Sequence, residues 1–225
     1  MITKDFLKEH YNNILIKNKE QILLGGIKDD FLSNVKDDNR MSLCLLIRIA
    51  PDITKKIEKC INELKEIESD SMYYYPSSDF HITVMDILKG ELGRKIPDNI
   101  NEYITCINEC AKSIKTFNIE FDGLTASNNA IMVRGFYDNE LQIFRELLRD
   151  NFEKRNLKLE ERYKTISSHI TIARAKDKLK NPEKIINYIN NDTYFGKMKV
   201  ENMELTFHNW YDTKKDVIEI INFQD

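Results

Sequence analysis

Two short segments carry residue types that suit chemistry at phosphorus. His81–Val84 reads His-Ile-Thr-Val, and His169–Ile172, 88 positions later, reads His-Ile-Thr-Ile. Ile, Val and Thr are β-branched and favour extended backbone, where positions i and i+2 point to the same face. Each tetrad therefore predicts a strand that presents one imidazole beside one hydroxyl. Two such strands side by side would line a cleft with two groups that titrate near neutral pH and two neutral hydrogen-bond donors.

This set of side chains matches an in-line displacement at phosphorus. One imidazole takes a proton from the attacking oxygen while the other gives a proton to the leaving oxygen, and each role contributes roughly 10²–10⁴-fold in rate. The hydroxyls bind the non-bridging oxygens as charge develops on them. The sequence thus predicts His81 and His169 as catalytic residues, with Thr83 and Thr171 as phosphate-binding residues. It does not decide which histidine is the base and which the acid.

The duplication separates this hypothesis from two alternatives. With the composition of this chain, the chance that two of its four histidines carry the flanked pattern is on the order of 10⁻³. One alternative is a pair of ordinary buried strands whose histidines sit in the core. The other is a metal site, but zinc takes three or four ligands and neither tetrad has a nearby partner such as His-x-x-x-His. We therefore predict no metal site and no cofactor.

The two tetrads resemble the defining motif of the 2H phosphoesterases, a family that includes 2'-5' RNA ligase-like proteins and cyclic nucleotide phosphodiesterases. That motif is a pair of His-x-Thr/Ser segments flanked by hydrophobic residues, and both copies match without departure. The resemblance covers about residues 41 to 225. It implies a bilobed α+β fold whose halves each present one motif strand to a central cleft. It also implies metal-independent chemistry on 2',3'-cyclic or 2'-5'-linked phosphates.

Hydrophobic periodicity predicts alternating helices and strands around the tetrads. Strands are expected at 41–50, 80–88, 117–125, 130–136, the second tetrad, 199–210 and 216–223, and helices at 3–24 and from about 51, 97, 138 and 181. Each motif strand is followed by a helix and then a hairpin, which is a coarse internal repeat. The predicted fold is α+β, duplicated and bilobed, with two antiparallel sheets flanked by helices and the two His-x-Thr strands in a central cleft.

Residues 1–40 are expected to form an N-terminal helical extension to a bilobed domain at 41–225. Gly25-Gly26 ends the helical pattern, and a polar, Asp-rich segment leads into the main body. The extension can pack on the outside of one lobe or cap the cleft. The sequence favours the first arrangement, since nothing in the extension looks catalytic.

Further residues near the tetrads are candidates for substrate contact. Tyrosine-containing loops precede both tetrads, and aromatic rings at a cleft mouth can stack on a nucleobase. Arg174 follows the second tetrad and could hold a phosphate, whereas Arg134 is expected to face outward. The candidates are Tyr75, Tyr163, Arg174, His208 and Trp210, with Tyr73 and Tyr74 in the same loop as Tyr75.

Composition limits the class of protein and of partner. The chain has 225 residues, 41% hydrophobic and 10% aromatic, which is ordinary for a globular core. A net charge of -3 argues against binding of long nucleic acid and favours a small nucleotide or a short RNA end as the ligand. The charged N-terminus and the absence of a run of ~20 apolar residues predict a cytoplasmic protein that binds no membrane. The cysteines show no metal-ligand spacing and are expected to be reduced structural thiols: Cys44, Cys60, Cys106 and Cys110.

The function predicted from these observations is that of a 2H-type cyclic phosphodiesterase, a metal-independent phosphoesterase that uses His/His general acid–base catalysis on 2',3'-cyclic phosphate or 2'-5'-linked nucleotide and RNA substrates. The reverse reaction, 2'-5' RNA ligation, belongs to the same prediction. The alternative is a protein that binds nucleotides or RNA ends in the same cleft without turnover. The sequence does not define the oligomeric state or the physiological substrate.

Overall fold

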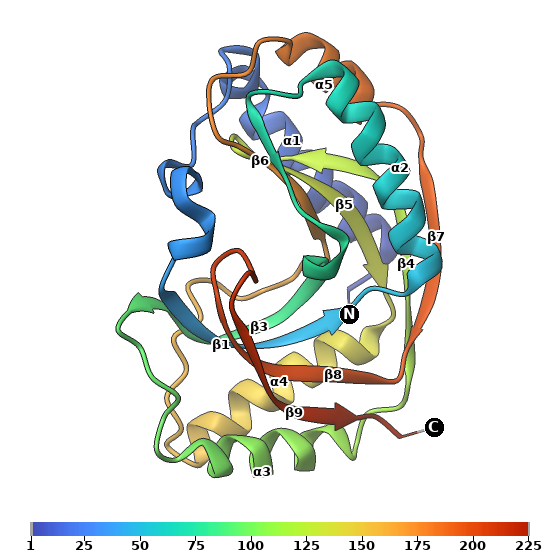
Figure 1. Cartoon of the computed structure of the whole chain (residues 1–225). Helices are drawn as coiled ribbons and strands as arrows, with labels where there is room; N and C mark the ends of the chain where they lie inside the picture. The colour runs from blue at the N-terminus through green and yellow to red at the C-terminus, as the bar shows by residue number, and fades with distance from the viewer. Residues whose placement is uncertain (1, 225) are drawn as a thin grey trace.

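The computed structural model describes residues 2–224, except for the side chains of residues 33 and 34, and is an α+β fold built on one curled sheet (Figure 1). The sheet has nine strands, and the path through eight of them runs β7-β4-β5-β6-β3-β1-β8-β9, while β2 pairs with β6. The strands are β1 (Arg40–Arg48), β2 (Met72–Tyr74), β3 (His81–Leu92), β4 (Phe117–Ala126), β5 (Ala130–Tyr137), β6 (Ile170–Ala175), β7 (Tyr194–Val200), β8 (Asn202–Asn209) and β9 (Lys215–Asn222).

The prediction of two separate sheets is wrong. The half with β7, β4, β5 and β6 joins the half with β3, β1, β8 and β9 through a single registered pair, Ile82 with Ile170. Beyond that pair the rest of the free edge of β6 is taken by β2, which pairs with residues 173–175. Because unpaired strand edges leave backbone donors and acceptors unsatisfied, the facing edges of the two halves join where they meet.

Two strands go beyond those expected from the sequence. The three-residue β2 is too short to show a period, and β7 covers Tyr194–Val200, most of which lies before the strand expected at 199–210. That expected strand is two strands, the end of β7 and all of β8, which lie in different halves of the sheet. The chain changes halves at Glu201, so a single run of strand-forming residues does not imply one strand.

Both expected hairpins are present, and each lies in the half of the sheet that contains the motif strand it does not follow in sequence. The β4–β5 hairpin follows the first motif strand in sequence but pairs with the second through β5 and β6. The β8–β9 hairpin follows the second motif strand but pairs with β1, the neighbour of β3. Each motif strand thus shares its half of the sheet with the hairpin that follows the other motif strand in the sequence.

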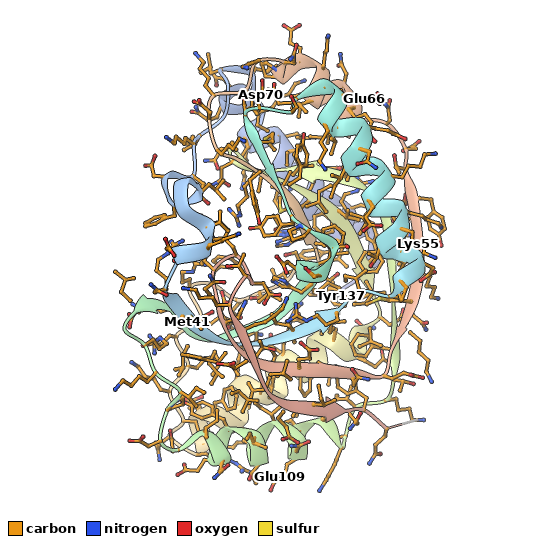
Figure 2. All side chains as sticks on the ribbon, in the orientation of Figure 1. Met41, Lys55, Glu66, Asp70, Glu109 and Tyr137 are labelled. Carbon is orange, nitrogen blue, oxygen red and sulfur yellow. The ribbon has the colours of Figure 1, made fainter. Side chains whose placement is uncertain are left out.

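Five α-helices cover the curled sheet (Figure 1). The helices α3 (Ile100–Ala111) and α4 (Asn139–Lys154) pack on each other and on strands β9 and β3. The helices α1 (Lys4–Leu23), α2 (Pro51–Ile67) and α5 (Pro182–Ile189) pack against β4, β5 and β7 and against one another. Side chains fill the spaces between helices and sheet (Figure 2). The helix spans follow the predicted apolar stripes, as in α2, where Pro51 occupies the first turn and Ile53, Ile57, Ile61 and Leu64 are buried.

The N-terminal helix contributes to the core of the first half. Leu7, Tyr11 and Ile22 of α1 are buried against the sheet, and the helix packs on β4, β5 and α5. A short 3₁₀ helix, η1 (Asp30–Asp37), then leads into β1. Asp29, just before η1, is buried and accepts a hydrogen bond of 2.9 Å from the Tyr211 hydroxyl.

All four cysteines are buried and unpaired. Among residues 2–224, no helix combines the length and the apolar character needed to cross a membrane.

Candidate functional site

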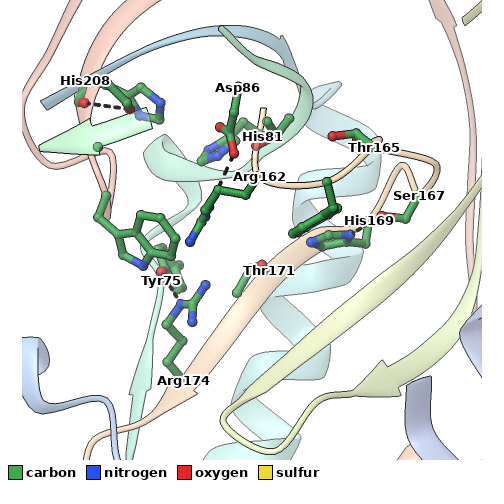
Figure 3. Close-up of a pocket in the computed structure, with 15 residues that line it drawn as sticks. Tyr75, His81, Asp86, Arg162, Thr165, Ser167, His169, Thr171, Arg174 and His208 are labelled. Carbon is green, nitrogen blue, oxygen red and sulfur yellow. Dashed lines mark hydrogen bonds and ion pairs between the residues drawn. The ribbon is translucent and has the colours of Figure 1, made fainter. Parts of the chain in front are cut away.

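One pocket brings both tetrads together (Figure 3). The four motif residues His81, Thr83, His169 and Thr171 line it, and so do all five candidate contact residues. The complete lining is Ser42, Tyr75, His81, Thr83, Asp86, Gly90, Arg162, Tyr163, Thr165, Ser167, His169, Thr171, Arg174, His208 and Trp210. Tyr73, Tyr74 and Arg134 are outside this lining, and the Arg134 guanidinium donates instead to the Asp122 carbonyl at 2.8 Å.

The pairing of β3 with β6 sets the order of side chains around the pocket. Ile82 pairs with Ile170 in antiparallel register, so His81 is diagonal to His169 and stands across from Thr171. Ile82 and Ile170 are fully buried, whereas the histidines and threonines on either side of them line the pocket. The alternation predicted for both tetrads is therefore present.

The fourth residue of each tetrad is a bulge, which changes which of the following residues faces the pocket. On β3, Thr83 pairs with Leu46 and Met85 with Leu45, which leaves Val84 as the extra residue. On β6, Thr171 pairs with Met132 and Ala173 with Ile131, which leaves Ile172 as the extra residue. A bulge re-aims the side chains that follow it. The residues five positions after each histidine, Asp86 and Arg174, consequently return to the pocket face.

His81 is held from behind by a backbone carbonyl. Its Nδ1 lies 2.8 Å from the Asp79 carbonyl oxygen, which can only accept, so Nδ1 carries a proton and Nε2 is the reactive nitrogen. Burial lowers the pKa of His81 to about 4, against the opposing effect of the nearby Asp212 carboxylate. Asp212 Oδ2 lies 4.0 Å from Nδ1 of His81.

Asp212 is a buried anion that sequence reasoning missed. It is fully buried in the turn after β8, with a positive φ of 61°, a region in which Asp is tolerated better than most residues. Arg48 and Lys215 form ion pairs with it, and His208 Nδ1 lies 3.0 Å from its Oδ1. These partners hold the pKa of Asp212 well below its usual range despite burial. It thus remains charged behind both His81 and His208.

His169 has a different environment. Its Nδ1 lies 2.8 Å from the Ser167 hydroxyl, which can accept or donate. Burial lowers the pKa of His169 to about 4, and the positive charges of Arg174 and Arg145 act in the same direction. No carboxylate lowers the cost of protonating this imidazole in the way that Asp212 does for His81, among the residues that the structure describes.

Arg145 links the two motif segments from inside the core. Its guanidinium is fully buried and donates to carbonyls on both sides of the pocket floor: Thr83, Val84, Ile166 and Ser167, at 2.8 to 3.3 Å. Burial lowers the pKa of Arg145 to about 10, so it stays charged at neutral pH. The sequence could have indicated that Arg145 is buried, because it lies on the same helical face as the predicted core residues Leu141 and Leu148.

Tyr11 of the N-terminal helix fixes the segment before His169. Its buried hydroxyl donates to the Gly135 carbonyl at 3.0 Å and accepts from the Ser168 amide at 3.0 Å. Gly135 allows this approach, since a Cβ at that position would be 2.0 Å from the Ser168 carbonyl oxygen. The Tyr11 hydroxyl thereby connects the N-terminal helix to the backbone directly before His169.

Arginines and an indole form the mouth of the pocket. The guanidinium carbons of Arg162 and Arg174 lie 4.6 and 5.7 Å from the centre of the Trp210 ring, and that of Arg40, which is outside the lining, lies 5.5 Å from it. Arg174 also donates to the Tyr75 hydroxyl at 3.0 Å, as the dashed line in Figure 3 marks. The Tyr163 side chain lies at the rim, 68% exposed. The pocket therefore offers cations and aromatic faces to a ligand, in a protein of net charge -3.

No group of three or more His, Cys, Asp or Glu side chains in the described part of the chain is arranged to hold a metal ion. The chemistry that the pocket's own side chains offer is proton transfer by imidazoles and hydrogen bonding by hydroxyls and guanidinium groups.

The sequence profile of the 2'-5' RNA ligase superfamily matches residues 53–211, which include both tetrads. The chain belongs to this superfamily. No curated protein sequence matches the chain. Solved structures with a similar fold include TT0787 of Thermus thermophilus, with a TM-score of 0.62 and 15% identity over 81% of this chain and 98% of that one. Another is E. coli LigT complexed with 3'-AMP, with a TM-score of 0.59 and 11% identity over 82% of this chain and 99% of that one. Superfamily membership supports a phosphoesterase or ligase class of enzyme.

Proposed function

We propose that this member of the 2'-5' RNA ligase superfamily is a metal-independent phosphodiesterase for 2',3'-cyclic phosphates or 2'-5'-linked nucleotides. The observation that carries the proposal is the position of both His-x-Thr segments on one pocket, with His81 diagonal to His169 across the Ile82–Ile170 pair. An acid and a base on opposite sides of one phosphorus need this arrangement.

In the proposed reaction, a water oxygen forms a bond to phosphorus as the bond from phosphorus to the ribose 2' or 3' oxygen breaks. One imidazole accepts the proton that the water loses, and the other donates a proton to the departing ribose oxygen. Thr83 and Thr171 donate hydrogen bonds to the non-bridging oxygens, with Arg174 as a charged donor beside them. The product is a phosphomonoester. Ligation uses the same proton transfers with a ribose 5' hydroxyl in place of water: its oxygen bonds to the phosphorus of a 2',3'-cyclic phosphate as the bond to the ribose 3' oxygen breaks, which leaves a 2'-5' phosphodiester and a 3' hydroxyl.

We assign His81 as the acid and His169 as the base. The reaction needs one protonated and one neutral imidazole, and local charges decide which one holds the proton. Asp212 lies 4.0 Å from His81 and stabilises its protonated form. His169 has Arg174 and Arg145 as charged neighbours, which favour the neutral form.

Two further observations support the nucleotide class of substrate. LigT, whose fold is similar, was crystallised with 3'-AMP and with phosphate, a nucleotide monoester and an inorganic anion. The pocket of this protein has an indole at its mouth, that of Trp210, on which a base can stack.

The bulges at matching positions of the two tetrads, Val84 and Ile172, also support an origin of the two halves by duplication.

A binding protein without turnover is the second candidate. The observation in its favour is that the pKa of both histidines is lowered to about 4, which leaves little of the singly protonated form near neutral pH. A bound phosphate adds negative charge beside the imidazoles and raises their pKa, so the phosphodiesterase remains the better-supported function.

The test is an incubation of purified protein with 2',3'-cyclic nucleotides and short 2'-5'-linked oligonucleotides in the presence of EDTA, followed by phosphorus NMR. We expect phosphomonoesters or cleaved linkages, and the spectrum also reports which ester bond breaks. Binding of the same compounds with no turnover from roughly pH 4 to 8, the range over which histidines titrate, would replace the enzyme with the binding protein.

A further inference from the structure

Asp86 is a carboxylate on the wall of a pocket that otherwise suits an anion. The bulge at Val84 turns it inward, five positions after His81. A negative charge there opposes phosphate binding, so phosphate chemistry does not explain it. Its Oδ1 accepts a hydrogen bond of 3.2 Å from the Cys44 thiol. Burial and the Asp86 charge raise the pKa of that thiol well above its usual value, so the thiol keeps its proton and remains a donor.

The group that faces Asp86 is a planar cation. Arg162 Nη2 lies 3.9 Å from Asp86 Oδ2, as the dashed line in Figure 3 marks, which is longer than a hydrogen bond. The same guanidinium lies 4.6 Å from the centre of the Trp210 ring. A flat group with N–H donors therefore occupies the space between an indole face and a carboxylate.

Arg162 can leave this position at small cost. Its side chain is 48% exposed, and its ion pair with Asp86 is both long and solvent-screened. By contrast, Arg40, whose guanidinium carbon lies 5.5 Å from the centre of the Trp210 ring, is held by two hydrogen bonds to Asp38, at 2.8 and 3.0 Å. Of these two guanidinium groups, the one over Asp86 is the easier to displace by a ligand of similar shape and donor pattern.

We infer that Asp86 and Trp210, on displacement of Arg162, form a base subsite selective for guanine. Guanine is flat and carries two adjacent donors, N1–H and the 2-amino group, which match a carboxylate in the way that a guanidinium does. Adenine, cytosine and uracil each place an acceptor within the corresponding edge, and that acceptor would face the carboxylate unpaired. The favoured substrate is accordingly a guanosine 2',3'-cyclic phosphate or an RNA end with guanosine at the reacting position. This inference rests on the proposed function in that the phosphate occupies the site of the two histidines.

The closing experiment measures binding, which does not require turnover. The dissociation constants of the four nucleoside 3'-monophosphates are determined by calorimetry for the wild-type protein and for Asp86→Asn. We expect guanosine 3'-monophosphate to bind at least about tenfold more tightly than the other three, the discrimination of one good bidentate pair. In Asp86→Asn that preference is lost, because the amide places a donor against guanine and pairs instead with the acceptor and amino group of adenine. Asp86→Asn should therefore bind adenosine 3'-monophosphate at least as tightly as the wild-type protein does.

Two variants control this result. Glu109→Gln removes another carboxylate that pairs with an arginine, on the exposed face of α3 and outside the pocket, and should leave the guanine preference unchanged. Trp210→Leu should weaken all four nucleotides alike, by about tenfold, because stacking does not depend on base identity.

The outcomes separate this inference from the proposed function. Equal binding of the four nucleotides, or a guanine preference that survives Asp86→Asn, overturns the guanine subsite whether or not the cyclic phosphates are hydrolysed. Selective guanine binding without hydrolysis supports the subsite and overturns the enzyme. Failure of all four nucleotides to bind at millimolar concentration overturns the subsite as well.

Discussion

The two motif strands, β3 and β6, have similar backbone conformations, but different side chains surround them. His81 is the first residue of β3, and His169 directly precedes β6; each is followed by Ile-Thr, a bulged fourth residue and a charged residue that the bulge returns to the pocket. The carbonyl of the bulged Val84 accepts from the Arg145 side chain, whereas that of Ile172 accepts from the Tyr75 backbone amide at 3.0 Å. Behind His81 lies the buried carboxylate of Asp212 with its partners Arg48 and Lys215, whereas the charged side chains that act on His169 are those of Arg174 and Arg145. Tetrads that differ only in their fourth residue are therefore placed in two chemically different environments.

Removal of each histidine gives the largest expected effect. His81→Ala and His169→Ala should each lower kcat for a cyclic phosphate by about 10²- to 10⁴-fold, since each removes one proton transfer. With a nucleoside 2'-(4-nitrophenyl phosphate), whose leaving group needs no proton, His81→Ala should retain most of the activity and His169→Ala should not. Steady-state kinetics on both substrates checks this. The opposite pattern would exchange the acid and the base.

Arg145→Met should destabilise the fold by about 3 kcal/mol or more, because it removes the buried guanidinium that donates to the carbonyls of Thr83, Val84, Ile166 and Ser167, although the Ile166 carbonyl keeps the Tyr137 hydroxyl as a donor. Urea unfolding measures the loss. Arg155→Met, just after the same helix and paired at the surface with Glu109, should destabilise the fold much less, since exposed ion pairs contribute little. Similar losses in the two variants would show that the buried guanidinium does not hold the motif segments.

Tyr11→Phe tests the support that only the second motif receives from α1. Loss of the hydroxyl should reduce the free energy of unfolding by about 1–3 kcal/mol and lower kcat, since the Ser168 amide beside His169 loses its acceptor. The exposed Tyr194→Phe serves as the matched control and should change neither quantity. An unaltered kcat in a destabilised Tyr11→Phe protein would limit this hydroxyl to a structural role.

The smallest effect concerns pH. The kcat/KM profile reports the free protein, where the pKa of both histidines is about 4, so it should be highest on the acidic side and fall as pH rises. Bound phosphate raises both pKa values, and the kcat profile should shift upward by about one pH unit. Measurements of both parameters from roughly pH 4 to 9 check this. Coincident profiles would mean that the bound anion does not reach the imidazoles.

Local patterns were sufficient to predict most helices, the hairpins and the side chains of the two tetrads that face the pocket, whose catalytic and phosphate-binding roles remain predictions. The stripe of isoleucines in α2 and the β-branched neighbours of His81 and His169 express periods that depend on a few adjacent residues. The five candidate contact residues were predicted from their proximity in sequence to the tetrads or from a shared strand face, and all of them line the pocket. Their roles in binding remain predictions.

Features that depend on a partner strand were not predicted. Arg174 was a candidate because it follows the second tetrad, but the bulge at Ile172 was not predicted: strict alternation places Arg174 opposite to Thr171, and only the bulge brings both to one face. Asp86 was missed for the same reason, and Asp212 because a turn residue gives no sign of burial. The junction of the two halves depends on which strand edges meet, which no local pattern specifies.

The single pair Ile82–Ile170 is also the one point at which β3 and β6 pair. The backbone pairing of the junction depends on these two residues, and the buried Arg145 ties the segments beside them, so side chains elsewhere on the two pocket walls can change without disturbing the pairing. Such a joint allows the histidines to stay fixed while the surrounding surface adapts to new ligands.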